Sequence, residues 1–183
     1  MRLFIAVLLN NEVKASLQAL QEQIKAQSSK SSFTRPENLH MTLAFLGETP
    51  AEKLDKLHRI IGEIETPAFE ITFNRTGCFT HSRKELWWIG IDLNDPMLPQ
   101  LKSLHGQLLA RLEQESFPVD KRPFNAHITL GREIRHSQPI VVDCQEIKVM
   151  VDRISLMKSE RYSAPGHTGG VLTYTEIFSK ALP

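Results

Sequence analysis

The chain has few cysteines, almost no net charge and no long apolar run. Its two cysteines, Cys78 and Cys144, form no Cys-x-x-Cys pair, which argues against a disulfide framework and favours a reducing cytoplasm. Lys and Arg number 22 against 21 Asp and Glu, and the resulting net charge of +1 argues against broad coating of nucleic acids. The apolar run from Leu3 to Leu9 is too short to span a bilayer, and no signal-cleavage pattern follows it. We therefore expect a cytoplasmic protein without a membrane segment, and most simply a monomer.

One nine-residue phrase occurs twice. RPENLHMTL fills residues 35–43 and RPFNAHITL fills residues 122–130, and the two agree at six positions. Their histidines, His40 and His127, lie 87 residues apart in a chain of 183. Repetition at half the chain length is typical of an internal duplication. We predict a single bilobal domain over residues 1–183, with an internal strand–helix–strand repeat whose copies lie at about 3–43 and 86–130.

Apolar periodicity predicts the same order of elements in both copies. The first has a buried strand followed by a helix with one apolar face, and the second repeats this order, at 3–9, 13–24, 86–93 and 98–112. Alternating apolar and polar residues predict further strands, at 69–73, 147–157 and 171–178. Residues 49–52, Thr-Pro-Ala-Glu, are typical of a helix capping box. The predicted fold is α+β: two pseudo-symmetric lobes around a central cleft, each with an antiparallel-rich sheet backed by helices.

The H-x-T sequence at the end of each phrase predicts paired polar side chains. Residues two apart on a strand point to the same face, so His40 and Thr42 share one face, as do His127 and Thr129. If a two-fold relates the lobes, these faces meet around one small ligand. Two imidazoles suit acid–base catalysis on a phosphodiester, because the ordinary histidine pKa of about 6.5 lies near neutrality. Threonine hydroxyls can donate hydrogen bonds to phosphate oxygens, although both threonines could be ordinary strand formers.

The residues five positions after each histidine differ between the phrases. Arg132 follows His127, and a guanidinium can clamp phosphate oxygens. Phe45 follows His40, and an aromatic ring can stack on a nucleobase or pack in the core. Cations gather around the second motif, at Lys121, Arg122, Arg132 and Arg135.

Other residues of the phrases have simpler interpretations. The arginines can form ion pairs, the prolines can set the path of the loop, and the asparagines can hold loop backbone, at Arg35, Arg122, Pro36, Pro123, Asn38 and Asn125. At least one of Trp87 and Trp88 should pack inside. The remaining histidines are expected to be structural or solvated, at His58, His81, His105, His136 and His167. A zinc site normally needs three or four ligands, and threonine stands where a second ligand would, so we expect no metal and no cofactor.

The two motifs carry a family resemblance. HMTL at 40–43 and HITL at 127–130 resemble the paired HxTx motifs of the 2H phosphoesterase superfamily. More narrowly, LFIAVLL, NLHMTLAFLG and RPFNAHITLGR resemble the bacterial RNA 2′,3′-cyclic phosphodiesterases, once called 2′-5′ RNA ligases. The resemblance covers essentially the whole chain, but the closing segment fits less clearly, and we assign no catalytic role to the loop at 163–170.

The resemblance implies a bilobal α+β fold and a metal-independent enzyme that opens 2′,3′-cyclic phosphates on RNA ends or nucleotides to 2′-phosphomonoesters. Some members also join RNA ends through a 2′-5′ bond. Carried over, His40 and His127 are the acid–base pair, Thr42, Thr129 and Arg132 bind phosphate, and Phe45 stacks on a base. We expect His127 to activate water and His40 to protonate the departing 3′ oxygen, although the near-symmetric site permits the reverse. Two rivals stay open: a non-catalytic module that binds RNA ends or nucleotides, and a 2H enzyme for another cyclic phosphodiester.

Overall fold

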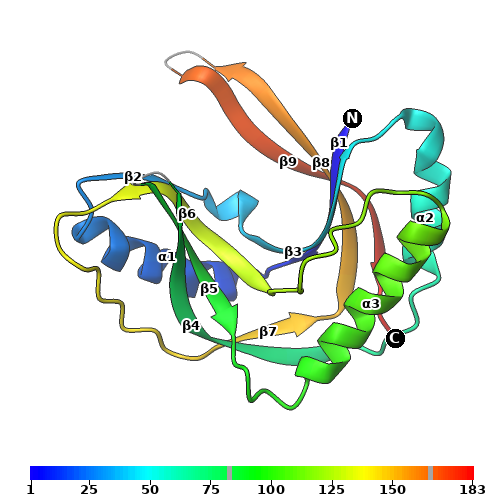
Figure 1. Cartoon of the computed structure of the whole chain (residues 1–183), viewed down its shortest axis with the longest axis horizontal. Helices are drawn as coiled ribbons and strands as arrows, with labels where there is room; N and C mark the ends of the chain where they lie inside the picture. Colours follow the sequence, from blue (N-terminus) through cyan, green and yellow to red (C-terminus); the bar gives the residue numbers. More distant parts are fainter. Residues whose placement is uncertain (82–83, 165–166) are drawn as a thin grey trace.

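Antiparallel strands of this chain form one strongly curled sheet, with helices at two ends (Figure 1). The computed structural model describes residues 1–81, 84–164 and 167–183. Its strands are β1 (Arg2–Leu8), β2 (Lys30–Phe33), β3 (His40–Glu48), β4 (Phe69–His81), β5 (Lys84–Ile91), β6 (His127–Arg135), β7 (Ile147–Val151), β8 (Arg153–Ala164) and β9 (His167–Ala181). Its helices are α1 (Asn11–Ala26), α2 (Leu54–Gly62) and α3 (Leu98–Gln114), with 3-10 turns η1 (Pro36–Asn38) and η2 (Ala51–Lys53). The α+β class and the antiparallel sheet confirm the predicted fold.

The sheet consists of two halves joined at its centre. The strand order is β7-β4-β5-β6-β3-β1-β8-β9, and β2 pairs with the outer part of β6. The central strands β3 and β6 are in register at Met41 and Ile128, both fully buried. The predicted lobes are therefore halves of one hydrogen-bonded sheet. The chain runs strand–helix–strand through β1, α1 and β3 and again through β5, α3 and β6; that these units are copies of one repeat stays a prediction.

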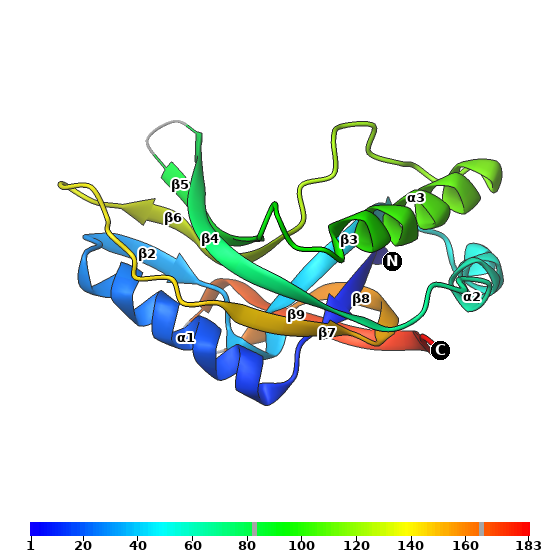
Figure 2. The same ribbon diagram turned by 90° about the horizontal axis from the view of Figure 1, so that it is seen from below.

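The helices pack at two opposite ends of the sheet. α1 follows β1, yet it contacts β6 and β7 of the other half-sheet. α2 contacts β9 and α3 at the opposite end of the molecule, as two perpendicular views show (Figures 1 and 2). The apolar stripe predicted for the first helix is buried, at Val13, Leu17, Leu20 and Ile24. The helices thus cover the face of the sheet that points away from the H-x-T side chains.

Two local predictions are wrong. Residues 147–157 are not one strand: β7 ends at Val151 and β8 begins at Arg153, in opposite half-sheets. β7 buries alternate residues, and β8 buries the consecutive residues 154–157, so apolar side chains continue on both sides of Asp152 as they would in one strand. The capping box also does not form, because the Thr49 hydroxyl donates to the Gly47 carbonyl and residues 51–53 form a 3-10 turn.

None of the helices in residues 1–81, 84–164 and 167–183 is long and apolar enough to cross a membrane.

Candidate active site

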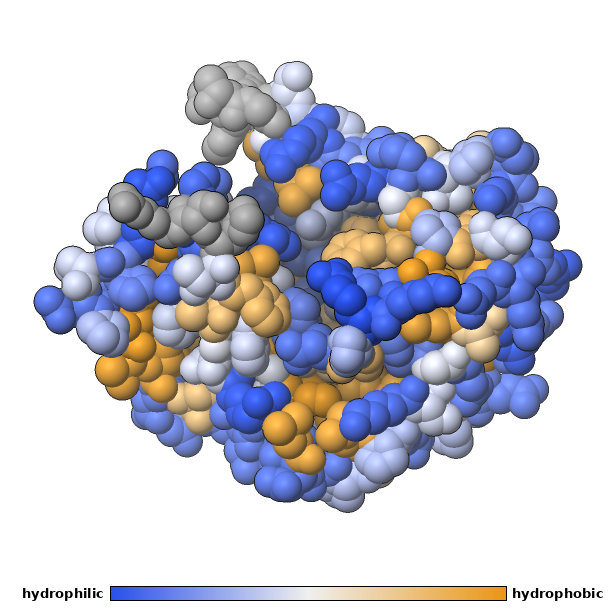
Figure 3. Space-filling model, in the orientation of Figure 1, coloured by the Kyte–Doolittle hydropathy of each residue, from blue (hydrophilic) through white to orange (hydrophobic). Residues whose placement is uncertain are grey.

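The junction of the two half-sheets brings both H-x-T motifs together. Met41 pairs with Ile128 in antiparallel register, which directs His40 toward Thr129 and Thr42 toward His127. Met41 and Ile128 point into the core, so the four polar side chains lie together on the other face. On that face the surface is hollowed between the arm formed by β8 and β9 and the β4–β5 hairpin (Figure 3). Residues 87 positions apart in the sequence therefore form one cluster.

Both histidine rings are anchored in the same way. His40 Nδ1 lies 2.7 Å from the Asn38 carbonyl oxygen, and His127 Nδ1 lies 2.7 Å from that of Asn125. A carbonyl only accepts, so each Nδ1 carries a proton and donates it. In the neutral ring, Nε2 then carries the lone pair that can accept a hydrogen bond or a proton, and in His40 the Thr42 hydroxyl donates to it. His40 Nε2 is 3.0 Å from the Thr42 hydroxyl.

The surroundings of His40 are apolar and aromatic. Its ring centroid is 4.9 Å from that of Phe4 and 5.2 Å from that of Tyr174, which meets it edge-on. Burial lowers the pKa of His40, and the positive charges of Arg132 and His127 lower it further against the opposing effect of the Asn38 hydrogen bond. The free protein therefore favours the neutral His40 imidazole at neutral pH.

The surroundings of His127 include an aromatic pair that the sequence did not indicate. The ring centroids of Phe79 and Trp88 lie 5.7 and 6.4 Å from that of His127. Trp88 lies across two glycines, since a Cβ atom at Gly77 or Gly90 would come within 2.5 or 2.9 Å of its ring. Because glycine has no side chain, these two positions leave room for the indole ring against the backbone of the strands.

The tryptophans at 87 and 88 point to opposite faces. Trp87 is buried and its indole nitrogen donates to Glu85 Oε2 at 2.8 Å, which confirms that one of the pair packs inside. Trp88 lies on the His127 side. Period-two alternation predicts that Trp87 and Trp88 point to opposite faces of the strand. Which face carries the histidines follows only from the strand order, and the same holds for the placement of Phe4, Tyr174 and Phe79.

Arg132 and Phe45 lie on the surface beside the cluster. Arg132 is exposed on β6, and its charge acts on His40. Phe45 is 64% exposed, with its ring centroid 6.3 Å from that of Phe4, so packing in the core does not account for it. A ring exposed to this degree is available for stacking.

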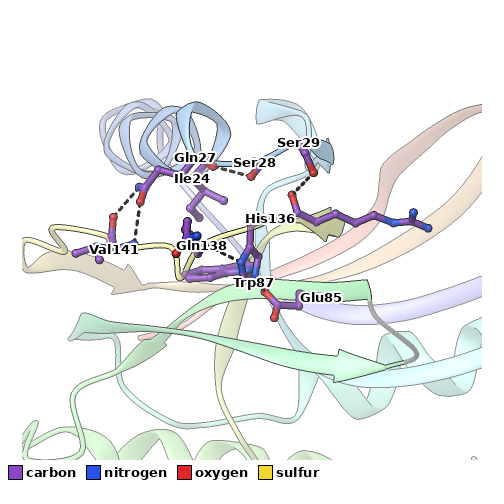
Figure 4. A network of polar contacts seen from close by, with 10 residues as sticks. Ile24, Gln27, Ser28, Ser29, Glu85, Trp87, His136, Gln138 and Val141 are labelled. Carbon is purple, nitrogen blue, oxygen red and sulfur yellow. Dashed lines mark hydrogen bonds and ion pairs between the residues drawn. The ribbon is translucent and has the colours of Figure 1, made fainter.

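The other described histidines have partners away from this cluster. His58 stacks on Phe178 at 4.4 Å, and His105 stacks on Phe124 at 3.7 Å. His136 bridges Glu85 and the Gln138 carbonyl beside Trp87. On the same side of the sheet, the side chain of Gln27, just after α1, donates to the Val141 carbonyl (Figure 4). The side chains of His81 and His167 lie outside the described part of the structure, as do residues 165–166 of the loop predicted at 163–170.

Among the described residues, no three or more His, Cys, Asp or Glu side chains come together in a way that could hold a metal ion. Threonine hydroxyls, the Tyr174 hydroxyl and the Arg132 guanidinium lie near the two imidazoles. Hydroxyl donors and a cation suit an anion better than a metal. The cluster is therefore typical of a site for a small phosphorylated ligand.

The sequence matches the family described as LigT like Phosphoesterase over residues 7–88 and 91–166, which include both H-x-T motifs. The chain belongs to this family. A protein named RNA 2′,3′-cyclic phosphodiesterase from Archaeoglobus fulgidus is 31% identical over 144 residues, 78% of each chain. One of the same name from Thermus thermophilus is 31% identical over 185 residues, 98% of this chain and 90% of that one. The crystal structure of E. coli LigT complexed with 3′-AMP superposes with a TM-score of 0.80 at 28% identity, covering 99% of this chain and 97% of that one. The LigT-like family is the one that the motifs predicted.

Proposed function

We propose that this LigT-like phosphoesterase hydrolyses 2′,3′-cyclic phosphates on RNA ends or nucleosides to 2′-phosphomonoesters. The observation that carries the proposal is the pair of imidazoles on adjoining strands, each with Nδ1 held by a backbone carbonyl and Nε2 left for proton transfer. The relatives named RNA 2′,3′-cyclic phosphodiesterase support this substrate class. Binding alone does not require two titratable groups, which argues against a non-catalytic module.

In this mechanism, His127 Nε2 takes a proton from water as its oxygen forms a bond to phosphorus. The bond between phosphorus and the 3′ oxygen breaks, and that oxygen takes a proton from His40. Arg132 and the hydroxyls of Thr42 and Thr129 stabilise the charge that develops on the non-bridging oxygens. The products are a 2′-phosphomonoester and a free 3′ hydroxyl. Two protonatable groups thus serve attack and departure in one step.

The same arrangement accommodates ligation. If a 5′ hydroxyl of a second RNA replaces water, the same bond to the 3′ oxygen breaks and a 2′-5′ phosphodiester forms. His127 and His40 keep their roles, since the attacking and departing atoms are still oxygens. We propose this as a secondary reaction of the site.

The first experiment measures turnover of a nucleoside 2′,3′-cyclic phosphate in excess EDTA and identifies the product isomer. The wild type should give the 2′-phosphate without added metal, and His40→Ala and His127→Ala should each lower kcat by about 10²- to 10⁴-fold, the usual contribution of a general acid or base. Absence of turnover by the folded wild type would rule out this substrate. Binding that persists without turnover would then favour the non-catalytic module, and turnover of another cyclic phosphodiester would favour the third alternative.

A substrate with sulfur in place of the 3′ oxygen tests the direction of proton transfer. A thiolate leaves without protonation, so the variant that lacks the general acid should recover most of its activity on this substrate. We expect recovery for His40→Ala and none for His127→Ala. Recovery of His127→Ala instead would reverse the two roles.

A further inference from the structure

The two similar phrases are held differently by their surroundings. In the first, the Asn38 side-chain amide donates to the Leu172 carbonyl of β9 at 2.9 Å, and the Arg35 guanidinium donates to the same oxygen. In the second, Arg122 pairs with Asp120, and Asn125 is exposed. The side chains of one arginine and one asparagine thus bind a distant strand, whereas among the described residues the side chains of Arg122 and Asn125 make no hydrogen bond to another strand.

These hydrogen bonds close the curl of the first half-sheet. β9 is its outermost strand, separated from β3 by β1 and β8. With strands about 4.8 Å apart, a flat sheet would separate β3 and β9 by about 14 Å. Nevertheless the ring centroids of His40 on β3 and Tyr174 on β9 lie 5.2 Å apart. The turn η1 reaches the free edge of β9, where unpaired backbone groups would otherwise face solvent.

Asn38 connects this closure directly to His40. Its backbone carbonyl accepts the hydrogen bond from His40 Nδ1, while its side chain, 5% exposed as a residue, donates to β9. Tyr174 is two residues beyond Leu172, so the strand that Asn38 holds also carries the ring that packs against His40. Movement of β9 would therefore disturb the His40 imidazole from two sides.

We propose that Asn38 and Arg35 are positioning residues: by binding the Leu172 carbonyl they hold β9 and Tyr174 against His40 and set the orientation of its ring. The second phrase lacks this clamp, so His127 is held by the Asn125 carbonyl and by Phe79 and Trp88, with no tie from its loop to an edge strand. The repeated phrase therefore supplies one imidazole whose loop is bound to the edge strand and one whose loop is not. The positioning role rests on the proposed function only in the experiments that measure turnover.

The test uses Asn38→Ala and Arg35→Met, with Arg122→Met as the matched control in the second phrase. Loss of the clamp should lower kcat by roughly 10- to 100-fold with KM changed much less, because misplacement of about 1 Å suffices for such losses. The Arg122 variant should keep the wild-type kcat. Arg35→Lys retains a donor and should recover part of the loss. If Asn38→Ala fails to fold, the exposed Arg35 position still provides the test.

The titration of His40 by NMR is a measurement that does not depend on turnover. The charged or titratable groups that face it are Arg132 and His127 from β6 and the Tyr174 hydroxyl from β9, and all three remain in these variants. Loss of the clamp should admit water and move the His40 pKa up toward its ordinary value. A purely structural role would lower the melting temperature and leave this titration unchanged.

A double-mutant cycle with Tyr174→Ala completes the test. If the clamp acts through β9, the losses of kcat in Asn38→Ala and Tyr174→Ala should not multiply, because both remove the same contact with His40. Folded clamp variants with wild-type kcat and wild-type His40 titration would overturn the proposal. An inactive wild type would refute the proposed function instead, and the NMR comparison would still decide the role of the clamp.

Discussion

His40 and His127 have the same hydrogen bond on Nδ1 and different neighbours on the other sides. His40 lies among Phe4, Tyr174 and Thr42, and burial lowers its pKa. The phosphate of a ligand would bring a negative charge close to this ring, which favours the imidazolium. The protonation of His40 should therefore depend on whether the site is occupied.

The first prediction concerns this dependence. The His40 pKa, followed by NMR, should lie below its ordinary value in the free protein and rise when adenosine 2′-monophosphate is added, because the phosphate charge opposes the effect of burial. Thr42→Val removes a hydroxyl donor and should weaken the rise. A His40 titration that does not respond to saturating nucleotide would contradict placement of the phosphate between the two rings.

A second prediction at this scale concerns His105, which stacks on Phe124. Burial lowers the pKa of His105 in the folded protein, so the unfolded chain binds more protons below about pH 6.5. Stability should thus be highest above that pH and fall as the pH drops through it. Urea unfolding at pH 7.5 and pH 5 should show a smaller difference for His105→Gln than for the wild type. Equal differences would exclude a contribution from His105.

Strand β5 places the side chains that border one side of the site. Its alternation sends Trp87 into the core and Trp88 toward His127, and the glycines at 77 and 90 leave room for the second ring. Glycine in the interior of a strand normally lowers the stability of the protein. Here the glycines let the indole lie flat across two strands.

Gly77→Ala should therefore displace Trp88. The new Cβ atom would lie 2.5 Å from the ring, and overpacking of this kind destabilises a protein by about 1–3 kcal/mol. Activity should fall as well, since Trp88 borders His127. Gly106→Ala in α3 is the control: its Cβ meets nothing within 4 Å, and alanine should stabilise the helix by about 1 kcal/mol. Chemical denaturation measures both, and wild-type stability of Gly77→Ala would show that the ring relaxes without cost.

The whole molecule combines near-neutral charge with an arginine beside the site. The net charge is +1, and Arg132 lies exposed next to the two histidines. The arrangement of the sheet, rather than an excess of charge, brings together the groups that we propose to bind a phosphate. Such a surface suits an RNA end more than a long backbone.

The salt dependence of binding tests this view of the molecule. With about one to three phosphates contacted, log affinity for single-stranded RNA should fall with log salt at a slope of roughly −0.7 to −2. The slope should stay the same when an oligonucleotide with a 2′,3′-cyclic phosphate is lengthened beyond a few residues. Fluorescence anisotropy on a length series measures this. A slope that steepens with every added nucleotide would indicate a long binding groove.

The sequence by itself determined the α+β class, the two H-x-T strands, the helix stripes and the membership of the LigT-like family, because local periodicity and a repeated motif express them directly. Only the tertiary structure decided that the lobes share one sheet, that residues 147–157 belong to two half-sheets, and that α1 packs on β6 and β7. It also brought Phe4, Tyr174, Phe79 and Trp88 around the histidines and gave Asn38 a partner on β9. Pairing between strands far apart in the sequence depends on packing across the whole chain, and no local pattern encodes it.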